Sequence, residues 1–448
     1  MIPKSVMTQV VEKQLKALED RQPGQTRRLL GEMPYLTDRA LLLGGVRGAG
    51  RSTLLLQMMR TEYPQAWYTD FEDPRLAGFD AGDFGKLGAL VAESGRGVVL
   101  LDKVDRAADW MPFVCGLLDG GLKVVATVSL DTLVRLRRVQ RMLLTGQDDA
   151  LRHRMPGRKP GKTAGVNRKA TGRGSALTAG GRGSEAASLR KSESASSGPE
   201  PLADEQTRME ACCERFLLYR VPLFSYGEFL EIHHKRPSEG AVQEYMLRGA
   251  FPEQQKTVRQ AALFDLYETI VARDVLLAKG VRDQDTLRRI ALRLISASGE
   301  SVTANALRKE LKVRAVTTVT EHMEHLERAG LVAFVPYWSE NPARRYVNPR
   351  KVYALYTALA AALTLRPHGD RAKIFETLIY HHLANRYDEL FYTSEEGGCD
   401  FVAIEEGRVV LCVQACYDGD DPDRLQQKAE GLVRALEMTR AARGLIVT

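Results

Sequence analysis

Residues 41–54, LLLGGVRGAGRSTL, combine an apolar run, a glycine-rich turn and a pair of hydroxyl residues. The spacing G-x-x-x-x-G-K-[ST] of a phosphate-binding loop is kept at Gly45, Gly50 and Ser52. Main-chain N–H groups of such a loop, and of the helix that follows it, attract an anion without a side chain. We therefore predict that phosphate is bound by Gly45, Gly48, Gly50, Arg51, Ser52 and Thr53.

The lysine of this pattern is replaced by Arg51. Arginine keeps the positive charge, but its planar fork is bulkier than an ammonium, so the charge alone does not establish that it reaches the β- and γ-phosphates in the same pose. Binding of phosphate is therefore easier to support from the sequence than hydrolysis.

Strands and helices alternate around this loop. Apolar runs at 39–44, 66–76, 97–102 and 123–129 are typical of strands, and 97–102, GVVLLD, ends in Asp102 as a buried parallel strand would. Strands separated by helices of ten to fifteen residues predict an α/β fold with a parallel sheet. Ligands then bind at the carboxyl ends of the strands.

Composition places the protein among ordinary globular chains, with 44% hydrophobic and 27% charged residues. No apolar run approaches the roughly 18 residues of a membrane span, and the first helix has no signal-peptide core, so we expect a cytoplasmic protein without a membrane partner. Six scattered cysteines indicate reduced thiols and neither disulfides nor a metal site.

The net charge of +7 is concentrated in one segment. Residues 152–191 hold eleven basic residues and the single acid Glu185, so the remainder of the chain is mildly acidic. Gly, Ser, Ala, Lys and Arg dominate about 139–207, which we interpret as a disordered insertion because too few apolar side chains offset the entropy of ordering. A solvated segment is favoured there over a nucleic-acid contact.

Several stretches together resemble a family of prokaryotic AAA-type P-loop ATPases. They include GGVRGAGRST, TDFEDPRL, LLDKVDRAADW, RFLLYRVPLFSYGEFL, EYMLRGAFPE, the RDV of Arg273–Val275, KVY and GCDFV. Members join an AAA domain to a domain of unknown function, DUF4143, with a winged helix and a restriction-endonuclease-like fold.

The resemblance implies α/β architecture with the P-loop NTPase parallel sheet, then a helical linker, a winged helix and a small α/β nuclease-like domain. We predict a P-loop domain at 1–232 containing the insertion, a linker at 233–284, a winged helix at 285–350 and an inactive nuclease-like domain at 351–448.

The same resemblance assigns roles around the nucleotide. ATP would bind with Mg²⁺, and Ser52 and Asp102 would hold the metal. Ser129 matches a polar sensor of the terminal phosphate, and Arg215 matches a sensing arginine; a strand-end hydroxyl and a surface arginine are equally good accounts of these two. Lys103 occupies the place of the glutamate that activates water, and an ammonium cannot accept a proton. Asp105 is the alternative base.

The C-terminal regions carry weaker signals. Arg314, Thr317, Thr318, Thr320 and His322 are expected on the outer side of the third winged-helix helix, and Arg344 and Arg345 on the wing, facing DNA. Glu321, Glu324 and Glu327 would repel a duplex, so a protein partner is an equal alternative. Glu376 and Asp400 fit nuclease acids, but Gln414 and Cys416 stand where Glu-x-Lys is required.

The leading hypothesis is an ATP-binding AAA-like protein with weak or absent hydrolysis, in which nucleotide arranges the C-terminal domains. The alternative is a DNA-associated or protein-interaction module with a relic P-loop, and an active nuclease ranks third. The sequence leaves the oligomeric state open.

Overall fold

The computed structural model describes residues 1–145, 205–249, 260–341, 344–345, 349–363, 371–387, 389–393 and 398–448. Most of the expected insertion therefore lies outside the described residues. Its predicted bounds are wrong at both ends, because helix α6 (Leu130–Thr145) continues past residue 139 and helix α7 (Glu205–Cys212) begins before 207. Past Val139, Gln140 of α6 donates from Nε2 to the Cys213 carbonyl at 2.6 Å and to the Phe216 carbonyl at 3.0 Å, a long-range contact that composition does not indicate.

A five-stranded parallel sheet forms the N-terminal half, in the order β2-β3-β4-β1-β5. Gly45 pairs with Ser129 and Asp70 with Asp102, so the phosphate loop and these polar residues share the carboxyl edge of the sheet. This confirms the α/β class and the parallel P-loop-type sheet. The strands are β1 (Ala40–Gly45), β2 (Trp67–Asp70), β3 (Val98–Asp102), β4 (Lys123–Ser129) and β5 (Phe216–Arg220).

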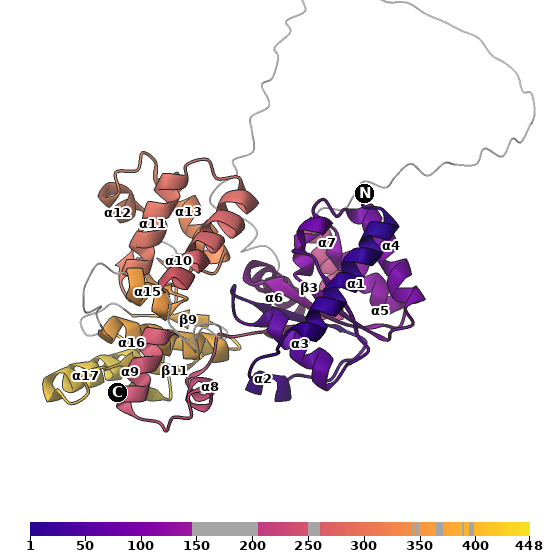
Figure 1. Ribbon diagram of the computed structural model, residues 1–448. Helices are drawn as coiled ribbons and strands as arrows, with labels where there is room; N and C mark the ends of the chain where they lie inside the picture. The colour runs from indigo at the N-terminus through magenta and orange to yellow at the C-terminus, as the bar shows by residue number, and fades with distance from the viewer. Residues whose placement is uncertain are drawn as a thin grey trace, which may run out of the picture.

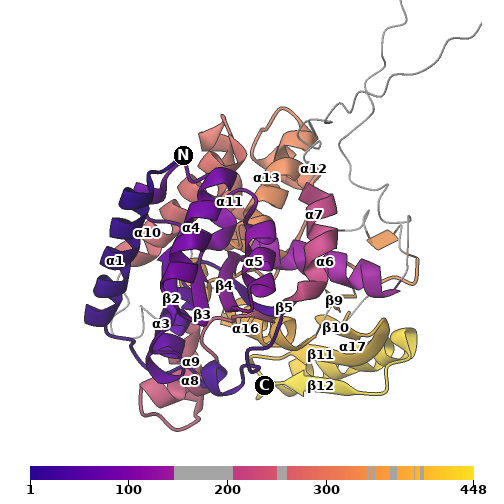
Figure 2. The same cartoon turned by 90° about the vertical axis from the view of Figure 1, so that its right-hand side faces the viewer.

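Helices cover the two faces of this sheet unequally (Figures 1 and 2). Ala40 and Leu42 of β1 face one core with the first group of helices, whereas Leu41 and Leu43 face α3 and a core that continues into the C-terminal half. The first group is α1 (Lys4–Asp20), α4 (Ala81–Glu93), α5 (Trp110–Asp119), α6 and α7; the other face carries α3 (Arg51–Thr61), and α2 (Arg28–Gly31) lies beside it.

The C-terminal half begins with α8 (Tyr226–Ile232), α9 (Glu239–Arg248) and α10 (Gln260–Thr269), which continues as a π-helical segment, Ile270–Leu277. Three helices follow, α11 (Gln284–Ser296), α12 (Ala304–Glu310) and α13 (Val316–Arg328). They pack with a three-stranded antiparallel sheet of order β6-β8-β7, comprising β6 (Ser301–Val302), β7 (Val332–Val335) and β8 (Arg350–Ala354). Strand β8 crosses the boundary predicted at residue 350.

The last part of the chain is a four-stranded sheet of order β12-β11-β10-β9 with helices beside it. Its elements are α15 (Thr357–Leu363), α16 (Arg371–Arg386), β9 (Glu389–Phe391), β10 (Phe401–Glu405), β11 (Arg408–Ala415), α17 (Pro422–Thr439) and β12 (Gly444–Val447). Among the residues that the structure describes, no helix is both long and apolar enough to cross a bilayer.

One buried arginine ties the phosphate loop to the segment after β5. Arg27 donates from Nε to Glu228 at 2.7 Å, from Nη1 to the Ala49 carbonyl at 2.8 Å and from Nη2 to the Pro222 carbonyl at 3.1 Å. Its guanidinium also lies 4.4 Å from the centre of the Phe224 ring. Because the Arg27 and Glu228 side chains are only 3% and 8% exposed, each charge depends on the other for its neutralisation.

Replacing Glu228 with Gln should therefore destabilise the protein by about 3 kcal/mol or more, since it leaves the Arg27 charge buried without its partner. The measurement is chemical denaturation of wild type and variant. Glu93→Gln, which removes a carboxylate paired at the surface with Lys4, is the control and should cost less than about 1 kcal/mol. Equal costs for the two variants would contradict this account of Arg27.

Candidate nucleotide site

The phosphate loop runs from the end of β1 at Gly45 to the start of α3 at Arg51. Gly48 and Gly50 have φ of 74° and 85°, a left-handed conformation that favours glycine. A side-chain carbon at Gly45 would lie 2.5 Å from the Val221 carbonyl oxygen, so only glycine fits beside that neighbouring segment. The loop is therefore shaped by close main-chain packing, and α3 begins directly behind it.

The Arg51 side chain extends from the start of α3 to β4. Its Nη1 donates to the Val128 carbonyl, in the strand next to β1. Burial lowers the pKa of Arg51, an effect that the nearby carboxylates of Asp105 and Asp102 oppose. The guanidinium thus points into the site, toward the strand ends and their acids, with one of its donors already engaged by the protein.

Asp102 is fully buried at the end of β3, and both of its oxygens accept hydrogen bonds. Thr127 Oγ1 donates to Oδ1 at 2.5 Å, and the Tyr68 hydroxyl donates to Oδ2 at 3.2 Å. The ammonium of Lys103 lies 3.8 Å from Oδ2. The residue expected to hold Mg²⁺ is therefore already surrounded by donors and by a cation.

Lys103 lies among three carboxylates. Its Nζ is 2.9 Å from Glu72, 3.3 Å from Asp70 and 3.8 Å from Asp102. Burial lowers the pKa of Lys103, but Asp102, Asp70 and Glu72 outweigh it and the pKa is raised. Its φ of 54° is uncommon for a residue with a side chain, and the main-chain N–H is fixed by a 2.7 Å bond to Thr127 Oγ1.

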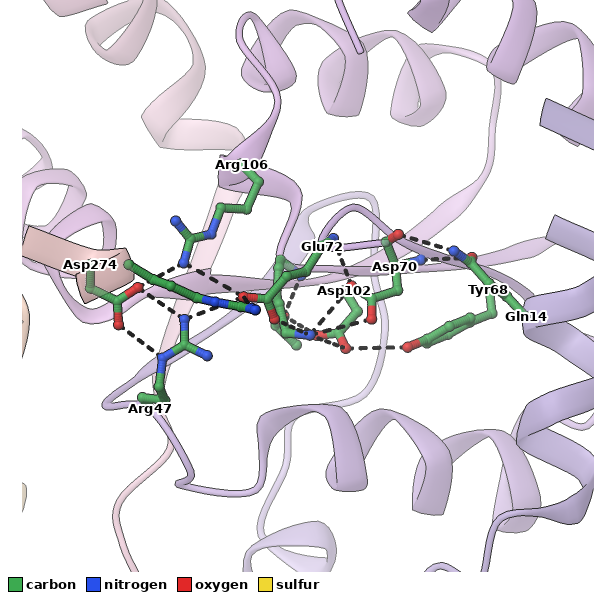
Figure 3. A network of polar contacts seen from close by, with 11 residues as sticks. Gln14, Arg47, Tyr68, Asp70, Glu72, Asp102, Arg106 and Asp274 are labelled. Atoms are coloured by element: carbon green, nitrogen blue, oxygen red, sulfur yellow. Dashed lines mark hydrogen bonds and ion pairs between the residues drawn. The ribbon is translucent and has the colours of Figure 1, made fainter. Parts of the chain in front are cut away.

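Further cations extend this cluster toward the C-terminal half (Figure 3). Arg47 of the phosphate loop donates two hydrogen bonds of 2.9 Å, from Nε and Nη2, to the carboxylate of Asp274. Its Nη2 also lies 3.3 Å from Oε1 of Glu72. Arg106 donates to the same Asp274 at 2.8 Å. Burial raises the pKa of Glu72, yet Lys103, Arg47 and Arg106 more than compensate and hold it at about 2.

Asp105 lies in the short 3₁₀ helix after β3 and Ser129 is the last residue of β4, and the contacts between them bear on both predicted roles. Asp105 Oδ2 accepts from the Ser129 main-chain N–H and from Thr132 Oγ1, each at 2.7 Å. The Ser129 hydroxyl donates to Thr132 Oγ1 at 2.9 Å and accepts from the Thr132 N–H at 3.2 Å. Asp105 therefore orders the start of α6, and the Ser129 hydroxyl behaves as a strand-end cap.

Arg215 is not brought to this site. It precedes β5 and pairs with Asp119, at 2.8 Å, where α5 ends. Phe216 pairs with Ala40 at the start of β1, whereas the phosphate loop follows the end of β1. About five residues of strand, each about 3.3 Å long, separate Arg215 from the loop, so it cannot reach phosphate bound within the same chain.

The C-terminal half rests directly on the phosphate loop. Asp274 lies in the π-helical segment, an irregularity that is frequent at functional sites. The Tyr356 hydroxyl donates to the main-chain carbonyl of Arg47 at 3.0 Å. Gly330, just after α13, packs so closely on Val46 that an added side-chain carbon would lie 3.0 Å from it. Sequence reasoning noted Arg273–Val275 as a motif but gave Asp274 no partner, and nothing in the sequence singled out Tyr356.

A cavity of about 540 Å³ opens beside the loop between the two halves. Its lining is rich in charge, with eight basic and four acidic residues. They are Arg47, Arg51, Lys103, Arg106, Arg135, Arg208, Lys279 and Arg328, and Asp105, Asp109, Asp131 and Asp274. The surplus of positive charge suits an anionic ligand.

The predicted DNA-facing surface of α13 is partly wrong. Arg314 and Thr317 are exposed, but His322 is buried, with 5% of its surface exposed, and burial lowers its pKa. Arg345 donates to the Ser339 carbonyl at 2.7 Å and lies over the Phe391 ring of the last sheet. His322 lies on the buried face of α13 together with Val319, Met323 and Leu326. Arg345 packs against the last sheet through Phe391.

The two nuclease-like acids do come together, around a lysine. Lys351 of β8 places its Nζ 2.9 Å from Glu376 and 3.0 Å from Asp400, and Lys428 contacts Asp400 at 2.6 Å. Gln414 accepts from the Asp400 N–H at 3.3 Å. The Lys351 ammonium thus lies between the two acids. The described residues include no group of three or more His, Cys, Asp or Glu side chains that could hold a metal ion.

Comparison with known proteins finds two family models in this chain. Residues 37–147 match the AAA domain, and residues 239–369 match a domain of unknown function, DUF8612. The N-terminal match agrees with the expected AAA-type P-loop module. The match in the C-terminal half is to DUF8612, and not to the expected DUF4143. The DUF4143 resemblance therefore stays a prediction, and so do the winged helix and the nuclease-like fold.

No curated protein matches the sequence. Among solved structures, AMPPCP-bound DnaA from Aquifex aeolicus is 11% identical, with a TM-score of 0.25, over 69% of this chain and 90% of that one. The RuvB Holliday junction branch migration motor of Thermotoga maritima is 15% identical, with a TM-score of 0.27, over 73% and 89%.

Removing the Lys351 charge should destabilise the last domain in a pH-dependent way. Lys351 and Lys428 hold the pKa of Asp400 below its usual value despite burial, whereas burial raises the pKa of Glu376. In Lys351→Met both carboxylates lose their shared cation, so their native pKa values rise. The loss of stability, about 3 kcal/mol or more at pH 8, should shrink as the pH falls to 5 and the carboxylates take up protons.

Denaturation curves of wild type and Lys351→Met at the two pH values test this. Lys309→Met, at an exposed position of α12, is the matched control. A loss that is the same at both pH values would show that Lys351 acts through packing and not through its charge.

Proposed function

We propose that this protein is a nucleotide-responsive AAA-like module in which ATP at the phosphate loop controls the arrangement of the C-terminal half. The AAA match over residues 37–147 and the loop geometry support nucleotide binding. One observation supports the control of the C-terminal half. Asp274 and Tyr356, which both lie in that half, are hydrogen-bonded to Arg47 of the phosphate loop.

The coupling has a physical basis because a bound phosphate and the C-terminal half both act on the conformation of the phosphate loop. Phosphates are held by main-chain N–H groups that must all point inward, so a bound anion fixes the conformation of Arg47 and its neighbours. Asp274 fixes the Arg47 side chain, and Tyr356 fixes its carbonyl. Any difference in loop conformation between the free and bound states is therefore transmitted to the elements that carry Asp274 and Tyr356.

Hydrolysis should be weak in this site. A general base must lie free to accept a proton from the attacking water. Lys103 stands at the expected glutamate position, and Asp105 is engaged by Ser129 and Thr132. The side chains that remain at the strand ends favour holding a nucleotide over cleaving it.

A second candidate is a DNA-associated or protein-interaction module whose loop is a relic. The internal bond from Arg51 to the Val128 carbonyl favours it, because a relic loop would satisfy its own cation in this way. The DNA contact would fall to the predicted winged helix, where Arg314 and Thr317 are exposed.

Arg51→Ala separates the two candidates. If the site holds nucleotide, the variant loses a charge-assisted contact with phosphate and should bind ATP at least about tenfold more weakly in titration calorimetry. Arg424→Ala, at an exposed position of α17, is the control and should bind as wild type does. Absence of ATP binding in wild type would leave the relic module as the function.

Asp274→Asn tests the coupling. It removes the charge that holds Arg47, so ATP should still bind while its effect on the C-terminal half is lost. In wild type we expect ATP to change amide hydrogen exchange in residues 270–277 and 350–356, and in the variant we expect this change to disappear. Asp265→Asn, at an exposed position of α10, should respond as wild type does. A response that survives in Asp274→Asn would place the coupling elsewhere.

A further inference from the structure

We infer that this site takes the phosphates of its nucleotide without a divalent metal, and that the Lys103 ammonium supplies the positive charge in its place. The inference rests on the proposed nucleotide binding and names the form of the ligand. It departs from the expectation that Mg²⁺ is held by Ser52 and Asp102.

The residues present do not fit a magnesium ion. Mg²⁺ requires a near-octahedral set of oxygen ligands and is usually anchored by one or two carboxylates. Both oxygens of Asp102 already accept hydrogen bonds, from Thr127 and Tyr68. The other two acids at this edge, Asp70 and Glu72, are paired with Lys103. A divalent ion would have to remove Lys103 from three carboxylates or lie beside its ammonium against like-charge repulsion.

The position of Lys103 is built into the fold. Thr127 accepts the main-chain N–H of Lys103 and at the same time donates to Asp102, so one hydroxyl fixes both residues relative to each other. The Lys103 side chain lies over the strand ends, with its Nζ 3.3 Å from Asp70 at the end of β2 and 3.8 Å from Asp102 at the end of β3. Only 23% of that side chain is exposed, unlike that of an ordinary surface lysine.

The charge of the adjoining cavity agrees with this assignment. Its lining residues carry a net charge of +4, which remains positive at +1 when the three carboxylates around Lys103 are counted, and the cations come from both halves of the chain. Lys279 and Arg328 from the C-terminal half share Asp131 at long distances of 3.8 and 4.0 Å, which leaves both able to turn toward an anion. A metal-free triphosphate carries more negative charge than its magnesium complex and is the better match for such a lining.

The test is calorimetric titration of ATP into the full-length protein in excess EDTA and again in excess Mg²⁺. We expect binding in EDTA to be as tight as in Mg²⁺, or tighter. Lys103→Met should bind at least about tenfold more weakly in EDTA, because one charge-assisted phosphate contact is lost, and should regain affinity when Mg²⁺ is added. Lys103→Arg keeps the charge and should bind without metal. Lys123→Met, at an exposed position at the opposite end of the sheet, is the matched control.

Each outcome decides the matter. Binding that appears only with Mg²⁺ in wild type overturns the inference while leaving the proposed function intact. Absence of binding under both conditions removes both. Metal-free binding by Lys103→Met as tight as wild type overturns the role of Lys103, and if that variant does not fold, the wild-type comparison in EDTA and Mg²⁺ still decides whether metal is needed.

Discussion

The arrangement of this molecule depends on a bidentate ion pair between Arg47 and Asp274. A guanidinium fork and a carboxylate match in geometry as well as in charge, so the pair fixes orientation in addition to distance. It joins the phosphate loop to a helical segment more than two hundred residues later. The neighbouring contacts, Tyr356 on the Arg47 carbonyl and Gly330 on Val46, are short-range and need the two surfaces already aligned.

Two acid clusters in this protein are neutralised in the same way, by a lysine. Lys103 lies among Asp70, Glu72 and Asp102, and Lys351 lies between Glu376 and Asp400. In each case the cation comes from the same chain and lies within ion-pair distance of every acid in the cluster. Removing one partner of a buried ion pair costs more than the pair contributes, so such clusters persist once formed. Acids that the sequence marked as candidate metal ligands, such as Asp102 and Asp400, are thus held by ion pairs within the chain.

Local patterns predicted the architecture of the N-terminal half well. The apolar runs of β1, β3 and β4 end in Gly45, Asp102 and Ser129, and such runs show little ambiguity when they alternate with helices. The same patterns placed Gly45, Asp102 and Ser129 at one edge, where the structure has them.

Contacts between distant residues lay beyond this reasoning. Arg215 was assigned by its motif, but its position before β5 directs it to the other end of the sheet. His322 was assigned to an outer face, yet its helix turns that position inward. The partner of Asp274 and the placement of Lys103 depend on which strand ends meet which helix, and sequence spacing carries no record of that.

The phosphate loop depends on residues that the ribosome makes much later than the loop itself. Ala49 in the phosphate loop is held through Arg27 by Glu228, and β1 pairs on one side with β5, whose residues follow the long segment after α6. A ribosome that has released only the first 145 residues has therefore made a sheet with an open edge beside β1 and a buried arginine without its counter-ion. Such an intermediate exposes unpaired backbone, which is the kind of surface that chaperones shield during translation. The contacts that hold Ala49 of the phosphate loop through Arg27 are therefore complete only after residue 228 has been made.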